Sequence, residues 1–383
     1  MLVQPFRGLA APLLVLVLLA GCEGAFDGDY RPRATGQEGE IMVVIDSTHW
    51  NADLGDAVRQ HIGPYVETLP TPERTFDLQQ VNLTSDRMFD IVQRHKNVMF
   101  VAPLSDETPV ANFLRGRLSD DVLQAALDGT PVVVPRNDLW RRSQRVYYVT
   151  AGNTEQLIDA LSERGSQIRE TFHEVTLDRM EREMFEKARQ YNLEDTLMQR
   201  HDFAVNVQHD YEIAIDTTTE DRGFIWLRRV LTDTRRELMI HYVEDMAPSD
   251  ITPDWIYTTR DSLTEKYLRG NVAGFVRTDY RRPLNTEETG FLDRYGYTTR
   301  GLWHFVRRTG DDGESLQGMA GGGPFVNYTF YDQESGRVYM IDGSVFAPEH
   351  GKRDFLRQME VIARTFRTRA ETEADDETLA ATE

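Results

Sequence analysis

The hydrophobic pattern of this chain changes period near residue 200, and this change constrains the fold more than any other feature. Before it, short continuous apolar runs such as Ile41–Ile45 alternate with stretches of helical spacing. After it, most runs alternate apolar and polar residues and are separated by polar turns. Continuous runs are typical of strands buried on both faces, whereas alternation is typical of antiparallel strands with one buried face. The sequence therefore predicts two domains of different class.

The first domain is expected over residues 41–152. Strand-like and helix-like stretches follow one another along it. Strands are expected at 41–45, 76–81, 97–101, 130–134 and 145–150, and helices at 53–62, from 84 or 85 to about 92, and at 110–127. This order predicts an α/β layer domain with a mostly parallel sheet and helices on both faces.

A long helical pattern then fills 153–199, with Thr154 as its expected N-cap and Gly165 as an expected kink. The second domain is expected over 200–368. Its strands are predicted at 203–207, 211–215, 224–231, 237–243, 274–279, 296–306, 324–331 and 337–346, and its helices at 253–268 and 353–366. Antiparallel strands packed by two helices predict an α+β sandwich.

The N-terminus carries a secretion pattern. A single charge, Arg7, precedes the apolar run 12–18, and Leu19-Ala20-Gly21-Cys22 follows it. A run this short predicts a cleaved signal peptide over 1–21 rather than a membrane span. Leu-Ala-Gly-Cys resembles the bacterial lipoprotein lipobox, which implies a diacylglycerol on Cys22 and an acyl chain, such as palmitate, on the new N-terminus. Two or more acyl chains make a durable membrane anchor. The alternative is a plain cleaved signal with a cysteine at the junction.

The net charge and the composition limit the classes of partner that this protein can bind. The net charge is −20, which argues against nucleic acid and against electrostatic binding to an anionic membrane surface. Four of the 43 basic residues are lysine, and either a saline habitat or arginine-rich codon usage explains this. Glycines among polar residues predict a flexible tether over 22–40, and the acidic segment 369–383 is expected to be disordered.

One candidate catalytic group follows the first strand. Asp46 and His49 could act as an acid/base pair with Ser47 as nucleophile, at the edge where open α/β sheets bind ligands. In the alternative, which fits the pattern better, Ser47 or Thr48 shapes a turn and Trp50 packs beneath it. The chain has no Gly-x-Ser-x-Gly elbow, so a hydrolase would lack the usual nucleophile geometry.

The second domain offers candidate binding residues. Gly322 lies in a glycine run that could hold a phosphate, although a flexible turn fits better because a strand follows it. Four aromatic residues could form a stacking platform for a sugar or peptide, although alternating aromatics on a strand fit a core better; they are Trp303, Phe325, Tyr328 and Phe330. The nine histidines show no metal-binding spacing and Cys22 is the one cysteine, so no metal or other cofactor is predicted.

Several motifs carry a family resemblance. In the second half they are Gly301-Leu302-Trp303, the stretches 319–328 and 342–348, and Lys352–Arg357. In the first half they are Val43–Asp46, Trp50, Gly55 and Leu69-Pro70. With these motifs the chain resembles a Bacteroidetes lipoprotein family of unknown function (domain of unknown function 4837). The resemblance adds Trp50 and Arg353 to the candidate binding residues, and it implies an envelope lipoprotein without a known activity. The second half also looks, more loosely, like the PsbP and Mog1-like sandwich, whose members are often binding or assembly factors.

These observations lead to one expectation and two alternatives. We expect a non-catalytic lipoprotein of the cell envelope, in the outer membrane, that binds an envelope protein or glycan. The first alternative is an envelope hydrolase that uses Asp46, Ser47 and His49. The second is a structural lipoprotein without a discrete site.

Overall fold

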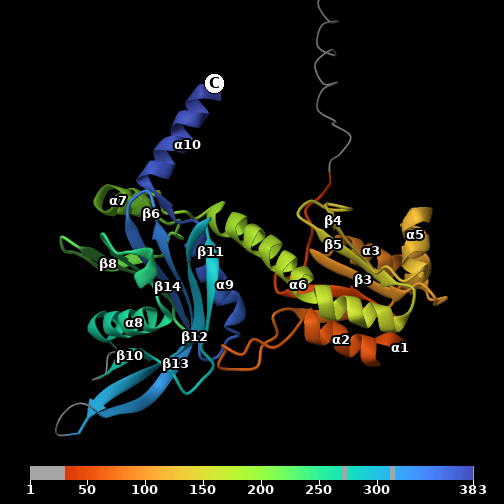
Figure 1. Ribbon diagram of the computed structural model, residues 1–383, viewed down its shortest axis with the longest axis horizontal. Helices are drawn as coiled ribbons and strands as arrows, with labels where there is room; N and C mark the ends of the chain where they lie inside the picture. The colour runs from red at the N-terminus through yellow and green to blue at the C-terminus, as the bar shows by residue number, and fades with distance from the viewer. Residues whose placement is uncertain (1–30, 270–273, 311–314, 383) are drawn as a thin grey trace, which may run out of the picture.

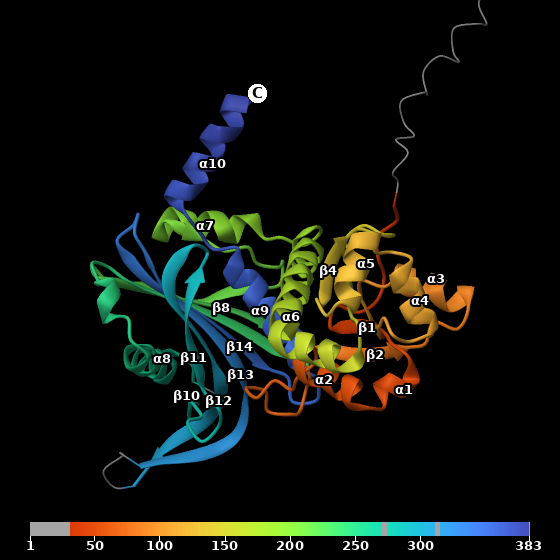
Figure 2. The ribbon, with the colours of Figure 1, turned by 45° about the vertical axis from the view of Figure 1, so that its right-hand side comes forward.

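The computed structural model describes residues 31–269, 274–310 and 315–382, and it consists of two domains joined by a long helix (Figures 1 and 2). The expected signal peptide, Cys22 and the first part of the expected tether lie outside the described residues. In the part of the chain that is described, no helix has both the length and the apolar character needed to cross a membrane.

The N-terminal domain is an α/β layer domain built on a five-stranded sheet with the order β2-β1-β3-β5-β4. The strands are β1 (Glu40–Val44), β2 (Asp77–Val81), β3 (Asn97–Pro103), β4 (Val132–Asn137) and β5 (Arg145–Ala151). The helices are α1 (Ser47–Trp50), α2 (Asp53–His61), α3 (Asp86–Arg94), α4 (Pro109–Arg115) and α5 (Asp120–Leu127). Strands β2, β1, β3 and β5 pair in parallel, and β4 is antiparallel to β5. The prediction of a mostly parallel sheet is confirmed.

The continuous apolar runs are explained by burial on both faces of this sheet. Val43 belongs to a core cluster that includes Leu54 and Val58 of α2. Its neighbour Val44 belongs to a separate cluster that includes Val110 of α4. Because successive side chains of a strand point to opposite faces, both must be apolar when helices cover both faces.

The residues just before β1 pack against this domain instead of continuing the expected tether. Ala34 is buried, and its N–H donates to the carbonyl of Arg142 at 3.0 Å. The carboxylate of Glu38 pairs with Arg179 at 2.9 Å and also with Lys96. The described part of the predicted 22–40 tether is therefore held in place, because backbone pairing and a partly buried ion pair outweigh its glycine content.

Two helices, the long connecting helix and a shorter one after it, replace the predicted single pattern over 153–199. They are α6 (Thr154–Phe185) and α7 (Tyr191–His201). Asn153 caps α6 by accepting a hydrogen bond from the N–H of Gln156. The helix runs without a break through Gly165, where a Cβ would lie 2.5 Å from the Cβ of His61. The glycine thus serves close packing of α2 on α6 instead of a break in the helix.

The C-terminal domain is an α+β domain around an eight-stranded sheet with the order β10-β12-β13-β14-β9-β8-β7, and β11 also pairs with β12. The strands are β6 (Phe203–Ala204), β7 (Glu212–Thr218), β8 (Arg222–Val230), β9 (Arg235–Val243), β10 (Phe275–Thr278), β11 (Asn285–Phe291), β12 (Arg294–Thr309), β13 (Ser315–Asp332), β14 (Arg337–Phe346) and β15 (Arg367–Thr368). The helices are the 3₁₀ turn η1 (Pro248–Asp250), α8 (Pro253–Tyr267), α9 (Arg353–Arg364) and α10 (Arg369–Thr382). All pairings in the sheet are antiparallel, as predicted.

Helices cover both faces of this sheet, with α8 on one and α9 and α6 on the other (Figures 1 and 2). Along β9, Met239 points to the cluster beneath α8, whereas Leu238 and Ile240 point to the larger cluster that includes Met359 of α9. Beyond the helices, β12 and β13 continue as a long arm (Figure 1).

The acidic C-terminal segment forms α10, so the prediction of a disordered tail over 369–383 is wrong for its described part. Thr368 and Glu371 form a reciprocal capping box, in which the N–H of Thr368 donates to the Glu371 carboxylate at 2.8 Å and the N–H of Glu371 donates to the Thr368 hydroxyl. Glu371 also pairs with Arg294 at 2.7 Å. These contacts start the helix, which stands away from the rest of the molecule in both views (Figures 1 and 2).

Candidate functional site

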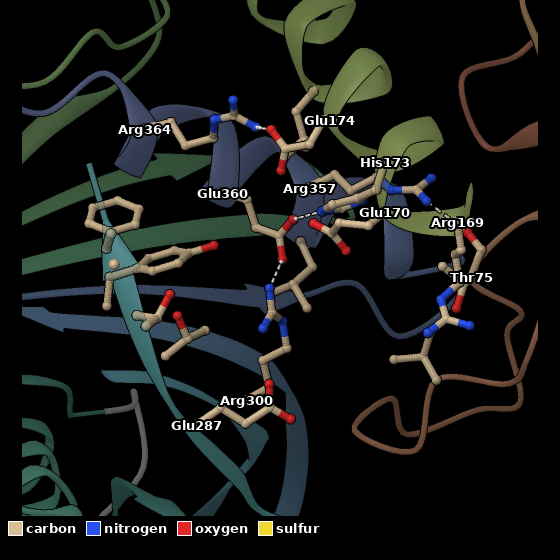
Figure 3. Close-up of a pocket in the computed structure, with 18 of the residues that line it drawn as sticks. Thr75, Arg169, Glu170, His173, Glu174, Glu287, Arg300, Arg357, Glu360 and Arg364 are labelled. Carbon is tan, nitrogen blue, oxygen red and sulfur yellow. Dashed lines mark hydrogen bonds and ion pairs between the residues drawn. The ribbon is translucent and has the colours of Figure 1, made fainter. Parts of the chain in front are cut away.

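A cavity of about 820 Å³ lies where the two domains meet, and we call it the seam cavity. Its walls come from α6, from α9, from β11 and the turn after it, from β12 and β13, and from the loop 66–75 of the N-terminal domain (Figure 3). The lining residues are Val66, Leu69, Thr75, Arg169, Glu170, His173, Glu174, Leu177, Glu287, Glu288, Thr289, Gly290, Phe291, Leu292, Asp293, Thr298, Arg300, Tyr328, Arg353, Leu356, Arg357, Glu360 and Arg364. Its volume falls in the range of ligand sites, roughly 300–1,000 Å³.

Glu360 of α9 stands at the centre of the polar wall. Its side chain is 5% exposed, and it pairs with Arg300 of β12 and with His173 of α6, each at 3.0 Å (Figure 3). Burial alone would raise the pKa of Glu360, but the charges of Arg300 and His173 hold this pKa well below its usual range. The carboxylate therefore stays ionised and ties both domains together.

Further α9 side chains clamp the loop 66–75 and α6. Arg353 donates to the carbonyl of Arg74 at 3.0 Å, and Arg357 donates to the carbonyl of Thr75 at 2.7 Å. The carboxylate of Glu73 accepts the N–H groups of Lys352 and Arg353 at the start of α9, where the helix dipole favours an anion. Most arginine contacts in the cavity wall are thus already committed to holding the domains together.

The remaining charges of the lining are unbalanced. Arg353 and Arg357 both pair with Asp354, and Arg364 pairs with Glu174. Four acids of the lining have no ion-pair partner among the described residues, and they are Glu170, Glu287, Glu288 and Asp293. The one lining arginine without a carboxylate partner there is Arg169, which donates to the carbonyl of His61. The unneutralised charge around the cavity is therefore mainly negative.

Two aromatic rings form the apolar wall. Phe291 of β11 and Tyr328 of β13 stack with their ring centroids 4.1 Å apart, and both residues are buried. Burial raises the pKa of Tyr328, so its hydroxyl stays protonated. Because each ring covers a face of the other, the pair packs as a wall and does not offer an open stacking platform.

The candidate catalytic residues after β1 do not form the expected acid/base pair. The Asp46 carboxylate accepts hydrogen bonds from the hydroxyl and the N–H of Thr48, at 2.7 and 2.9 Å, and these bonds lower its pKa. The Nε2 atom of His49 instead lies 2.5 Å from the carboxylate oxygen Oδ2 of Asp106, which follows β3. The N–H of Ser47 donates to Asn82 at 2.9 Å. Asp46 therefore caps α1, and the sequence analysis missed Asp106 as the partner of His49.

The other candidates divide between core and cavity. Trp50 packs against the N-terminal core beneath the guanidinium of Arg59, 4.6 Å from the ring centroid. Trp303 and Phe325 are buried in the cluster under α8, so they cannot form a surface platform. Tyr328 and Arg353 are the sequence-predicted residues that line the seam cavity.

Gly322 lies inside β13, so the expected flexible turn at this glycine run is wrong. A Cβ at Gly322 would stand 2.5 Å from the carbonyl oxygen of Trp303, and one at Gly323 would stand 1.9 Å from that of Val345. The glycines are needed because neighbouring backbone approaches closely, which is a known role of glycine within strands.

A second polar cluster lies on the opposite face of the large sheet, under α8. Arg260 is 1% exposed and pairs with the fully buried Asp342 at 2.7 Å. Arg260 also donates to the hydroxyl of Thr278, and Asp342 accepts a hydrogen bond from the amide of Asn327. Nearby on β9, burial raises the pKa of Glu237 to about 7. This face is a closed core in which charged groups serve the fold.

Sequence reasoning missed Glu360, Arg300 and His173, although one signal was present. Polar residues recur at helical spacing in α9 at Arg353, Arg357, Glu360 and Arg364. A charged stripe on a helix with an apolar opposite face predicts a solvated or ligand-facing surface. Arg300 and His173 gave no comparable signal, because only the folded chain brings them to Glu360.

Comparison with protein families assigns the two halves to different models. Residues 190–365 match the family described as "Domain of unknown function (DUF4837)", and residues 34–185 match "Domain of unknown function (DUF8532)". The sequence analysis had expected one family along nearly the whole chain. No curated protein matches the chain.

Among solved structures, the Ran-binding protein Mog1p of Saccharomyces cerevisiae is similar at 11% sequence identity with a TM-score of 0.27, over 44% of this chain and 90% of that chain.

Proposed function

We propose that this protein is a non-catalytic binding protein of the bacterial cell envelope, anchored through a lipid on Cys22, which holds a partner protein in the seam cavity. One observation carries the proposal. The cavity is lined from both domains, and its central carboxylate, Glu360, is already paired with Arg300 and His173. Groups that are held in ion pairs can orient a partner, whereas acid/base catalysis needs groups that are available to exchange protons.

A protein partner fits the cavity better than a glycan. Sugars are commonly bound by open aromatic faces, and here Phe291 and Tyr328 stack on each other. The wall does provide a strand, β11, and unpaired carboxylates, which suit backbone and basic side chains.

Filling the cavity tests the proposal. Thr289 lines the cavity on β11, and Thr289→Trp would place a large ring there. The matched control is Glu220→Trp, at an exposed turn near the opposite edge of the sheet. Each full-length variant is expressed in its native host, crosslinked in living cells and purified, and the proteins that come with it are quantified by mass spectrometry.

We expect a recurrent partner that is retained by the wild type and by Glu220→Trp and lost with Thr289→Trp. A partner retained equally by all three proteins would show that the cavity is not its binding site. The anchor is tested separately, since Cys22→Ser should move the protein from the membrane fraction to the soluble fraction. Membrane retention of Cys22→Ser would contradict the lipid anchor.

A further inference from the structure

Strand β11 has an open edge at the seam cavity. It pairs with β12 along all seven of its residues. Within the described residues, no backbone hydrogen bond joins β11 to any other strand. Alternate N–H and C=O groups on its outer edge are therefore available to another strand, because successive residues of a strand direct these groups to opposite sides.

The side chains of this edge are acidic and accessible. Glu287, Glu288 and Gly290 are exposed, and residues 287–291 all line the cavity. Glu287 accepts a hydrogen bond from the amide of Asn285, and neither glutamate has a cationic partner among the described residues. Glu170 on the facing helix α6 adds to the same cavity a third carboxylate that has no ion-pair partner within 31–269, 274–310 and 315–382. Opposite charges on paired strands stabilise the pairing, so this edge is complementary to a basic strand.

From this edge we infer that β11 receives an extended, basic segment of the partner protein as an added strand, with lysine or arginine side chains beside Glu287 and Glu288. This inference rests on the proposed function and names the chemistry of the partner. Main-chain hydrogen bonds to β11 supply affinity, and the carboxylates supply selectivity.

Two other occupants are disfavoured by charge. A second copy pairing β11 with β11 would bring the acidic pairs of both chains together, and like charges across strands are destabilising. The chain's own segment 22–30 carries Glu23, Asp27 and Asp29 and no basic residue, so the same repulsion opposes it.

Backbone methylation provides the sharpest test. The probe is a seven-residue peptide that alternates lysine and valine, matched to the length of β11. Two derivatives carry N-methyl groups, one on every lysine and the other on every valine. Binding to the purified full-length protein is followed by fluorescence anisotropy. We expect one derivative to lose affinity by tenfold or more and the other to bind like the parent, since only alternate N–H groups face β11.

Charge reversal gives an independent readout. Glu287 points to the same face of the sheet as Phe291, whereas Glu288 points to the other face. Because the lysines of the peptide all lie on one face, Glu287→Lys should weaken binding of the lysine peptide by roughly tenfold and strengthen binding of a glutamate–valine peptide, and Glu288→Lys should have the smaller effect. The matched control Glu220→Lys makes the same change of charge near the opposite edge and should leave both affinities unchanged.

The outcomes separate the inference from the proposed function. Equal effects of the two methylation patterns, or a wild-type protein that dimerises through β11, would overturn strand addition. If a cellular partner is lost with Thr289→Trp while the peptides show no alternation, the cavity binds its partner by another mode. If the peptides alternate and Thr289→Trp changes no cellular partner, the edge accepts strands and the proposed function fails.

Discussion

Buried ion pairs lie on both faces of the large sheet, but their surroundings differ. Under α8, Arg260 and Asp342 are closed off from solvent, and Thr278 and Asn327 complete their hydrogen bonds. On the other face, Glu360 is equally buried, but its partners Arg300 and His173 border a cavity between the domains. The first network serves the fold alone. The second also shapes a surface that another molecule can reach, and this difference distinguishes a structural ion pair from a candidate binding site.

Breaking the closed pair should give the largest loss of stability. Arg260→Met leaves the carboxylate of Asp342 buried without a charge partner, which typically costs about 3–5 kcal/mol. Urea unfolding followed by circular dichroism measures this loss. The double variant Arg260→Met/Asp342→Leu should recover much of the stability, because no unpaired charge remains. A double variant as unstable as the single one would show that packing, rather than charge, dominates this site.

Breaking the pair at the cavity should cost less. Glu360→Gln removes the charge that Arg300 and His173 share, and we expect a loss of roughly 2 kcal/mol because Arg300 remains partly solvated. Since the pKa of Glu360 is lowered by folding, its contribution is complete above the ordinary carboxyl pKa and is lost as the pH falls below it. The difference in unfolding free energy between wild type and Glu360→Gln should therefore shrink from pH 7 to pH 3. A constant difference would contradict the ion pair.

Glu237 sharpens the contrast because its pKa changes in the opposite direction. Burial raises this pKa from 4.5 to about 7, so the folded state holds the proton more tightly than the unfolded state. Stability is complete below pH 4.5 and falls as the pH rises to 7. Relative to Glu237→Gln, the wild type should lose roughly 2–3 kcal/mol between pH 5 and pH 8, as measured by unfolding at each pH. Parallel pH profiles for the two proteins would show that Glu237 does not titrate in this range.

The smallest effect on stability is expected at the strand edge. Glu287→Lys alters an exposed side chain without an ion-pair partner among the described residues, so its unfolding free energy should stay within about 0.5 kcal/mol of wild type. The same variant should weaken peptide binding. A large loss of stability would instead assign Glu287 to the fold.

The elements that were predicted correctly are those whose apolar pattern along the chain sets their conformation. The run Ile41–Ile45 reads as a strand buried on both faces, and Val43 and Val44 do point to different cores. Strand β11 was missed because Asn285–Phe291 is polar and lacks apolar alternation, so its conformation depends on pairing with β12. The helix α10 was missed for a different reason. Its acidic composition suggested disorder, while the capping box at Thr368 and Glu371 was overlooked.

The candidate site was predicted only in part, because it is assembled from distant segments. Tyr328 and Arg353 came from motifs in the second domain, and both line the cavity. Glu360 meets His173 across nearly 190 positions of sequence, and this contact exists only once the domains dock. The partner of His49 was missed for the same reason, because Asp106 approaches His49 from the end of a different strand.

The most direct test of the account compares the two faces in living cells. A photoreactive amino acid is placed either at Glu170, which is exposed and lines the seam cavity, or at Ser262, which is exposed on α8. The account predicts a crosslinked partner protein from position 170, none from position 262, and loss of the first crosslink when Thr289→Trp is added. A partner captured from position 262 and not from position 170 would contradict the seam cavity as the binding site.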